Sequence, residues 1–398
     1  MYNTPLNERH PRISWLLWAC LLALMVIGVA FISSTKPPVE GVAWYRQFYM
    51  KQVLWYVVGA GAAAGVCLVD YRSLARWALV AYWITIVFLV SVLIPGIGTT
   101  HGWGARRWID FGPFQMQPSE FAKLALLVAM AHFLSRPLEE LRQPSVFLKS
   151  LGLTALPFVL ILKEPDLGSA LVLFPITLLM MLAAGVPTQF LVRFLGCVGL
   201  VVMMVVGTVL FAPSGWQPIH GYQRDRLLVF FGRDFADPQA TPEQQRKDRQ
   251  RQKDRTYQVN QALISVGSGG FWGRGWRQGQ QINLRFLPPE AAHNDFIFSV
   301  IAEEKGFLGS VTVLTLYALI LFSGIRIASQ ARDRLGRLLA VGVVALLFSH
   351  VFVNIGMNIR LMPVTGIPLP LLSYGGSSVL CSLIAAGILQ NVYLHRRS

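Results

Sequence analysis

The chain has 398 residues, of which 54% are hydrophobic and 14% charged, with a mean hydropathy of +0.50 and a formal net charge of +15. This composition excludes an ordinary soluble enzyme of two domains and is typical of a polytopic membrane protein. Nucleic acid is not an expected partner, because the basic residues divide between the two sides of the predicted membrane.

Apolar runs long enough to cross a hydrocarbon core of about 30 Å as helices recur along almost the whole chain. The two runs in the middle of the series are short, so nine or eleven spans are open alternatives. We predict one integral membrane domain, all-α, with about ten transmembrane helices and a large outer loop at 213–295. The predicted spans are 14–33, 52–69, 77–96, 120–135, 148–162, 167–185, 190–212, 296–327, 335–358 and 377–394.

The distribution of Lys and Arg predicts the orientation. Fourteen lie on the side that holds both termini, and seven lie in the short loops of the other side. Since cytoplasmic loops carry the excess of basic residues, we expect both termini inside and 213–295 outside. The first span would act as the targeting signal, and the four cysteines, all within predicted spans, indicate neither disulfides nor structural zinc.

Several outer segments depart from plain membrane helix. The segment 96–120 is rich in Gly and aromatic residues, and "KEPDLG" at 163–168 is a short turn. The charged run 236–255 is expected to be disordered or a solvated helix, and the Gly-rich run 266–281 a loop lying against another element. The apolar stretch 362–378, broken by Pro and Gly, predicts a re-entrant or cavity-lining segment.

Polar residues in these segments each allow two interpretations. Glu120 and Lys123, spaced i, i+3, share a helix face and should point into the bundle, either as part of a site or as a salt bridge between helices. Asp166 precedes a span and could simply cap it. Arg106 and Arg107, beside Trp108, suit an interfacial anchor or a bidentate grip on phosphate.

The stretch "HNDFIFSVIAEEKG" carries an acid at the mouth of a predicted helix and two more within it. Asp295 could be the N-cap of that helix or a general base beside a cavity. Glu303 and Glu304 lie eight and nine residues further, about 80° and 180° around a helix of 3.6 residues per turn. We therefore expect them to be a structural or cavity-polarity pair.

Together these outer features predict a substrate with a phosphate-bearing head and a lipid tail. They also fall into an ordered set of motifs, which are "GARRWIDFG" with "QPSEFAK", "EPDLG", "GSGGFWGRGW", "HNDFIFSVIAEEKGFLG" and "PVTGIPLPLLSYGGSS". In order and spacing the chain resembles the SEDS family of cell-wall polymerases from the first span to the C-terminus. Within the family it resembles the elongation branch, RodA, more than the division branch, FtsW.

The resemblance implies a peptidoglycan glycosyltransferase of the bacterial cytoplasmic membrane that polymerises lipid II, the undecaprenyl-pyrophosphate-linked disaccharide peptide, on the outer face. It implies a class B penicillin-binding transpeptidase and the elongation machinery as partners. The family's functional positions fall on Arg107, Gln117, Glu120, Lys123, Asp166 and Asp295. We add Ser373, in the broken segment, as a substrate-binding candidate.

The chain departs from the family pattern in three places. It has Asn294 where the family usually has Thr, it has Gln115 where many relatives have a basic residue, and the charged run at 239–254 resembles an insertion. We assign that run no catalytic role.

The expected mechanism has Asp295 as the general base for an acceptor sugar hydroxyl. Arg107, Lys123 and a divalent cation, Mg²⁺ or Mn²⁺, would hold the pyrophosphate, with Asp295, Glu120 and Asp166 as candidate metal ligands. Two rival functions are a flippase that moves lipid-linked precursors without chemistry and a non-catalytic scaffold for a transpeptidase. The clustering of polar groups on one side of the membrane favours the enzyme.

Overall fold

The computed structural model describes residues 13–36, 41, 43–99, 106–112, 114–211, 222–233, 241–287 and 289–396. Three sequence predictions lie partly outside these residues: the orientation of the chain ends, the middle of the outer segment 96–120, and the long loop 213–295 at 213–221, 234–240 and 288.

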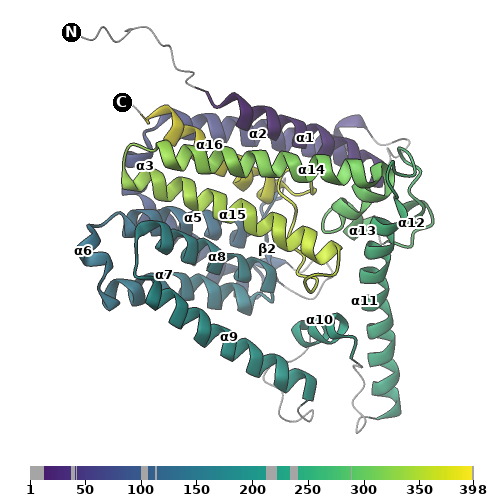
Figure 1. Ribbon diagram of the computed structural model, residues 1–398. Helices are drawn as coiled ribbons and strands as arrows, with labels where there is room; N and C mark the ends of the chain where they lie inside the picture. The colour runs from purple at the N-terminus through teal and green to yellow at the C-terminus, as the bar shows by residue number, and fades with distance from the viewer. Residues whose placement is uncertain are drawn as a thin grey trace.

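The predicted all-α architecture is confirmed, because most helices run side by side in one bundle (Figure 1). The first half of the chain forms α1 (Trp15–Thr35), η1 (Trp44–Arg46), α2 (Phe48–Leu68), α3 (Tyr71–Arg76), α4 (Ala78–Leu93), α5 (Pro118–Leu134), α6 (Leu138–Leu141), α7 (Pro144–Lys163), α8 (Leu167–Ala184) and α9 (Thr188–Phe211). The second half forms α10 (Tyr222–Phe231), α11 (Pro242–Ser268), α12 (Gln280–Asn283), α13 (Pro289–Ala292), α14 (Ile297–Gln330), α15 (Arg334–Asn358) and α16 (Gly376–Leu394).

Eight of the helices in the described part of the chain are long and apolar enough to cross a membrane: α1, α2, α7, α8, α9, α14, α15 and α16. Helix α4 is apolar but has only 16 residues, and α5 has 17 and carries Glu120 and Lys123. Each predicted span therefore coincides with a helix. The number of complete crossings, about ten, stays a prediction.

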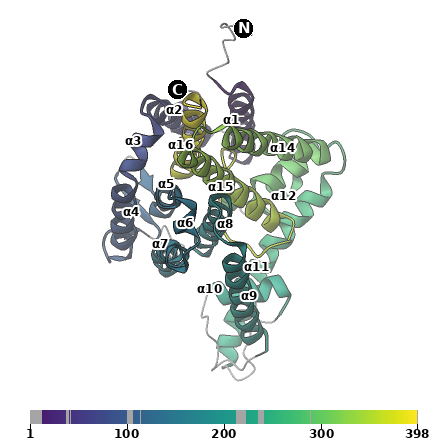
Figure 2. The same ribbon diagram turned by 60° about the vertical axis from the view of Figure 1, so that its left-hand side comes forward.

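Helix α15 forms the centre of the bundle and packs against α5, α8, α14 and α16 (Figure 2). Small residues allow this close packing: a Cβ on Gly342 would collide with Leu127 and Met180. Helix α9 is the opposite case, since it diverges from the bundle in both views and exposes side chains such as Leu195 and Leu200. Exposed apolar side chains along a helix long enough to cross a membrane are suited to contact with lipid.

Three short strands are an addition to the predicted all-helical fold. They are β1 (Gly98–Thr99), β2 (Trp108–Asp110) and β3 (Gln115–Met116), paired antiparallel in the order β1-β2-β3. The register places Ile109 opposite Gly98 and Met116. The sheet precedes α5 directly: β2 begins just after Arg107, and β3 ends just before Gln117.

The long loop is largely helical in its described part. Helix α11 lies across the end of the bundle that carries α12 and α13, crosswise to α14 and α15 (Figure 1). The charged run is thus a helix from residue 242 onward, mostly exposed, which was one of its two predicted states. Helix α10 packs against α9 and α11 through Leu228 and Val229.

The Gly-rich run 266–281 lies against a kink in α14, as predicted for a loop that contacts another element. At the kink, Gly306 has a φ of 64°, which breaks the helix, and the Phe307 N–H donates to the Gly270 carbonyl at 2.8 Å. A Cβ on either Gly306 or Gly273 would collide with the backbone of the other segment. Only bare backbone on both sides permits this contact.

The segment 362–375 is not helical, as its Pro and Gly content predicted. It is nonetheless buried at Ile367, Leu369 and Leu372, and it returns the chain into the bundle between α15 and α16. Irregular backbone of this kind needs polar partners inside the protein. Those partners define the site described next.

Candidate active site

Asp295 lies in the short connection between α13 and α14, and it does not cap the helix that follows. The N-cap residue of α14 is Phe296, with no side-chain cap hydrogen bond. The N–H of Ser299, in the first turn, is instead bound by Oδ1 of Asn358 at 3.3 Å. The alternative interpretation of Asp295 as an N-cap is therefore wrong.

The backbone around Asp295 is fixed by α15 and by the broken segment. Nδ2 of Asn354 and Nδ2 of Asn358 both donate to the Asp295 carbonyl, at 3.0 and 3.1 Å. One residue earlier, Oγ of Ser373 donates to the Asn294 carbonyl at 2.5 Å. Ser373 thus holds the backbone beside Asp295, and its contact with substrate stays a prediction.

Three charged groups influence the Asp295 carboxyl. Burial raises its pKa to about 6, against the opposing effect of the Arg226 and Arg107 guanidinium groups and with a smaller contribution from Asp166. Gly366 lies between two of these groups, because a Cβ built on it would be 3.5 Å from Asp295 Oδ2 and 3.7 Å from Arg226 Nη2. A carboxyl with this pKa is mostly ionised at neutral pH and can still accept a proton.

Arg226 comes from α10 in the long loop. Its Nη1 donates to the Thr365 carbonyl at 2.9 Å, which ties α10 to the broken segment. Arg107 reaches the same region from the strand side: its Nε donates to the Glu164 carbonyl at 3.2 Å and its Nη2 to the Pro165 carbonyl. Two guanidinium groups from distant parts of the chain therefore act electrostatically on one carboxylate.

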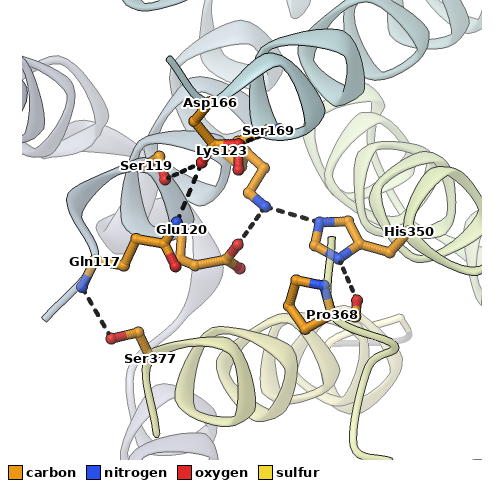
Figure 3. Close-up of polar contacts among 9 residues, drawn as sticks. All are labelled: Gln117, Ser119, Glu120, Lys123, Asp166, Ser169, His350, Pro368 and Ser377. Carbon is orange, nitrogen blue, oxygen red and sulfur yellow. Dashed lines mark hydrogen bonds and ion pairs between the residues drawn. The ribbon is translucent and has the colours of Figure 1, made fainter. Parts of the chain in front are cut away.

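Asp166 is the N-cap of α8, as its alternative interpretation proposed. Its Oδ1 accepts from the Ser169 N–H at 3.1 Å, and its Oδ2 accepts from Gln117 Nε2 at 3.1 Å and Ser119 Oγ at 3.3 Å (Figure 3). The Gln117 N–H in turn donates to Ser377 Oγ. Asp166 and Gln117 thus join α5, α8 and the start of α16.

Glu120 and Lys123 face the bundle interior, as predicted, and lie almost completely buried. Lys123 Nζ donates to Glu120 Oε1 at 2.6 Å and to His350 Nε2 at 2.9 Å (Figure 3). Because an ammonium can only donate, Nε2 must accept, so the proton of a neutral His350 is on Nδ1, toward the Pro368 carbonyl at 3.4 Å. In this arrangement the Lys123 ammonium is paired with the Glu120 carboxylate and also donates a hydrogen bond to a neutral imidazole.

The predicted residues thus form two groups. Asp295 is influenced by Arg107 and Asp166, whereas Glu120 and Lys123 form a separate buried pair with His350. The three candidate metal ligands do not assemble: across the described ranges, no group of three Asp, Glu, His or Cys side chains could hold an ion. The carboxylates of Glu120 and Asp166 are also already engaged, so these residues do not fit the expected cation site.

Sequence reasoning missed Arg226 and the polar face of α15. Arg226 stands in a short helix among other charged residues, and no local pattern distinguishes it. His350, Asn354 and Asn358 did carry a signal, since a spacing of i, i+4, i+8 places three polar groups on one face of an otherwise apolar span. Such groups within a span usually mark a functional or bracing surface.

Glu303 and Glu304 have separate partners on other segments of the chain. Glu303 Oε1 accepts from the Gln281 N–H at 3.1 Å and its Oε2 from Ser265 Oγ at 3.3 Å, so it holds the long loop. Glu304 Oε1 accepts from Ser34 Oγ at 2.5 Å, at the end of α1. These contacts agree with the expected structural pair.

The family model and the individual relatives that match this chain all point to one family. The family model of FtsW, RodA and SpoVE, described as "Cell cycle protein", matches residues 14–398. This chain belongs to that family, the SEDS family that its motifs resemble. Peptidoglycan glycosyltransferase MrdB of Escherichia coli K12 is 36% identical over 331 residues, covering 82% of this chain and 80% of the relative. A probable peptidoglycan glycosyltransferase FtsW of Trichlorobacter lovleyi is 34% identical over 375 residues, with coverage of 94% and 91%.

Two solved structures resemble this SEDS protein over almost its full length. One is a chain of a peptidoglycan synthase complex that coordinates polymerization and crosslinking, with a TM-score of 0.76, 28% identity and coverage of 97% and 99%. The other is the rod shape determining protein RodA of Thermus thermophilus, with a TM-score of 0.66, 27% identity and coverage of 97% and 98%. The multi-pass membrane fold of the family is thus shared by this chain.

Proposed function

We propose that this SEDS protein is a peptidoglycan glycosyltransferase that polymerises lipid II, with Asp295 as the general base. The observation that carries the proposal is the Asp295 carboxyl, which is free of the helix cap and lies under the influence of Arg226 and Arg107. A base beside two guanidinium groups suits a reaction in which a hydroxyl loses a proton and a pyrophosphate departs.

In the proposed step, the 4-hydroxyl oxygen of the acceptor sugar forms a bond to the anomeric carbon of the donor. The bond from that carbon to the undecaprenyl pyrophosphate oxygen breaks, with inversion at the carbon. The hydroxyl proton passes to the Asp295 carboxylate. Arg226 and Arg107 balance the negative charge of the departing pyrophosphate.

The remaining site residues support this arrangement from their observed contacts. We propose that Gln117 and Asp166 orient the first turn of α8 beside Arg107. Ser373 would hold the backbone next to Asp295. Glu120 and Lys123 would affect the substrate indirectly, because their buried pair shapes the part of the bundle below the site. No step is assigned to a metal ion, and a chelator in the assay tests whether a cation held in part by the substrate contributes.

The deciding experiment is lipid II polymerisation by purified protein with a class B transpeptidase, with glycan products resolved on a gel in the presence of moenomycin. We expect ladders from the wild type and none from Asp295→Asn or Asp295→Ala. Asp70→Asn is the matched control, because Asp70 caps the short helix α3 far from Asp295 in the sequence and contacts none of the site residues named above. Full ladders from both Asp295 variants would show that the base is another group.

The partner assignment has independent support. The structural neighbour in a peptidoglycan synthase complex that couples polymerization to crosslinking favours a crosslinking transpeptidase as the partner of this chain. We propose an elongation role in the cytoplasmic membrane, with both termini inside and Asp295 outside. Similar identities to MrdB and FtsW relatives leave a division-type role as the alternative. Rescue of a strain depleted of its elongation or its division polymerase separates the two.

The flippase alternative is favoured by one observation, the buried Glu120–Lys123–His350 group within the bundle. The flippase would be supported over the glycosyltransferase by two results together. The Asp295→Asn protein would transport fluorescent lipid II across vesicle membranes, and the wild type would form no glycan ladders.

A further inference from the structure

Helix α15 carries two amides at the end nearest Asp295. Asn354 and Asn358 are both completely buried, four residues apart on one helix face. A buried amide inside an apolar bundle is unfavourable unless its donors and acceptor are bonded. The partners of these two side chains therefore indicate what they do.

Both amides act on the same carbonyl. Nδ2 of Asn354 donates to Asp295 O at 3.0 Å and also to Ile367 O at 2.7 Å. Nδ2 of Asn358 donates to Asp295 O at 3.1 Å. Asp295 is thus tied through its backbone to α15 and, through Asn354, to the broken segment that carries Gly366.

Asn358 has a second contact, to the start of α14. Its Oδ1 accepts from the Ser299 N–H at 3.3 Å and from Ser299 Oγ at 2.6 Å. The first N–H groups of a helix lack partners within the helix, and Asp is among the residues that bind them best. Asn358 thus supplies, from another helix, a cap that an aspartate just before α14 would otherwise provide.

We propose that Asn354 and Asn358 are positioning residues for the base: they hold the Asp295 backbone and cap α14 in its place, which keeps the Asp295 carboxylate directed toward Arg226 and Arg107. This inference rests on the proposed function. Without Asn358, the carboxylate can turn back to the unsatisfied N–H groups of α14 and leave the substrate.

The test is a comparison of Asn358→Ala and Asn354→Ala with Asn391→Ala. Asn391 is an equally buried amide, on α16, whose Nδ2 donates to the Val66 and Val69 carbonyls at 2.6 Å each, so it controls for the loss of a structural amide. We would measure kcat and KM for lipid II, with the partner transpeptidase present, from pH 5 to 9, together with the thermal stability of each variant.

We expect Asn358→Ala to lower kcat by about 10- to 100-fold, as small displacements of a catalytic group do, while KM changes little. The acidic limb of the kcat profile should move to lower pH, because backbone N–H groups stabilise a capping carboxylate. The charged groups that face Asp295 from neighbouring elements, Arg226, Arg107 and Asp166, are unchanged in the variant.

Asn354→Ala leaves the contact between Asn358 and Ser299 in place, so kcat should fall less than in Asn358→Ala. This variant also provides the test if Asn358→Ala does not fold. Asn391→Ala should lose stability with its acidic limb in the wild-type position. The proposal is overturned if, in both Asn354→Ala and Asn358→Ala, the acidic limb of the kcat profile stays at its wild-type pH or moves to higher pH. In that case activity would be lost only in proportion to the loss of folded protein. Failure of the base assignment is seen separately, as normal ladders from Asp295→Asn.

Discussion

Asp166 and Asp295 occupy similar places, each at the start of a long apolar helix, yet their carboxylates have different neighbours. Asp166 caps α8 and accepts two further hydrogen bonds, from Gln117 and Ser119. Asp295 leaves the cap of α14 to Asn358, and the charged groups that act on it are Arg226, Arg107 and Asp166 itself. The comparison indicates that, where another residue caps a helix, the acid just before that helix need not bond to it.

The largest expected effect is on catalysis at Asp295. Asp295→Asn should lower the polymerisation rate by about 10²- to 10⁴-fold, the usual contribution of a general base. Its thermal stability should equal or exceed that of the wild type, because a neutral amide replaces a carboxylate whose ionised form is disfavoured by burial. Rate measurement together with a melting curve checks both, and a large loss of stability would place Asp295 with Asp166 as a structural acid.

The pH dependence should be the next largest effect. Since burial raises the Asp295 pKa to about 6, kcat/KM should fall about tenfold per pH unit below that value as the base is protonated. The stability effect has the opposite sign: the raised pKa favours the protonated fold, so stability declines as the pH rises through about 6. Rates and melting temperatures from pH 4.5 to 8 should therefore run in opposite directions, and a rate that is flat down to pH 5 contradicts the assignment.

At Asp166 the main loss should be in stability. Asp166→Ala removes the cap of α8, which costs about 1 to 2 kcal/mol. Asp166→Asn keeps a cap acceptor and should melt closer to the wild type. Thermal melting in detergent compares them, and an Asp166→Ala protein that is fully stable but inactive would assign this acid to catalysis as well.

A last effect, on stability alone, is expected at Glu164, beside Asp166. Both of its carboxyl oxygens are buried without a hydrogen-bond partner in the described structure, and burial, together with the nearby Asp166 charge, raises its pKa to about 9. It is therefore neutral at pH 7, where the folded protein holds a proton that the unfolded chain releases, so Glu164→Gln should already melt above the wild type there. The stability of the wild type should fall as the pH rises from the ordinary range of a carboxyl pKa to about 9, and that of the variant should not. Equal melting curves for both proteins from pH 7 to 10 would contradict the raised pKa.

Much of this fold follows from local sequence. Apolar runs located a helix at every predicted span, and the Pro and Gly content of 362–378 predicted its broken backbone. The i, i+3 spacing of Glu120 and Lys123 correctly predicted an inward-facing pair, because both charges would be costly in lipid.

The relation between Asp295 and its cap could not be read locally. Asn358 reaches Ser299 across 59 positions of sequence, and Arg226 reaches Thr365 across 139. Such contacts depend on how helices pack, which composition and periodicity do not specify. For the same reason the pairing of Lys123 with His350 was not predicted, although the polar face of α15 was visible in the sequence.

The contact between Gly306 and Gly273 also bears on mutational tolerance. Each position needs a bare backbone because the other segment is pressed against it. In a saturation scan both positions should therefore tolerate almost no replacement, and pairs of changes should not rescue each other, since two side chains need more room than one. Intolerance at these glycines would reflect the space between two segments. In such a scan, intolerance to substitution would therefore indicate a catalytic or binding role only at positions where a polar side chain is required.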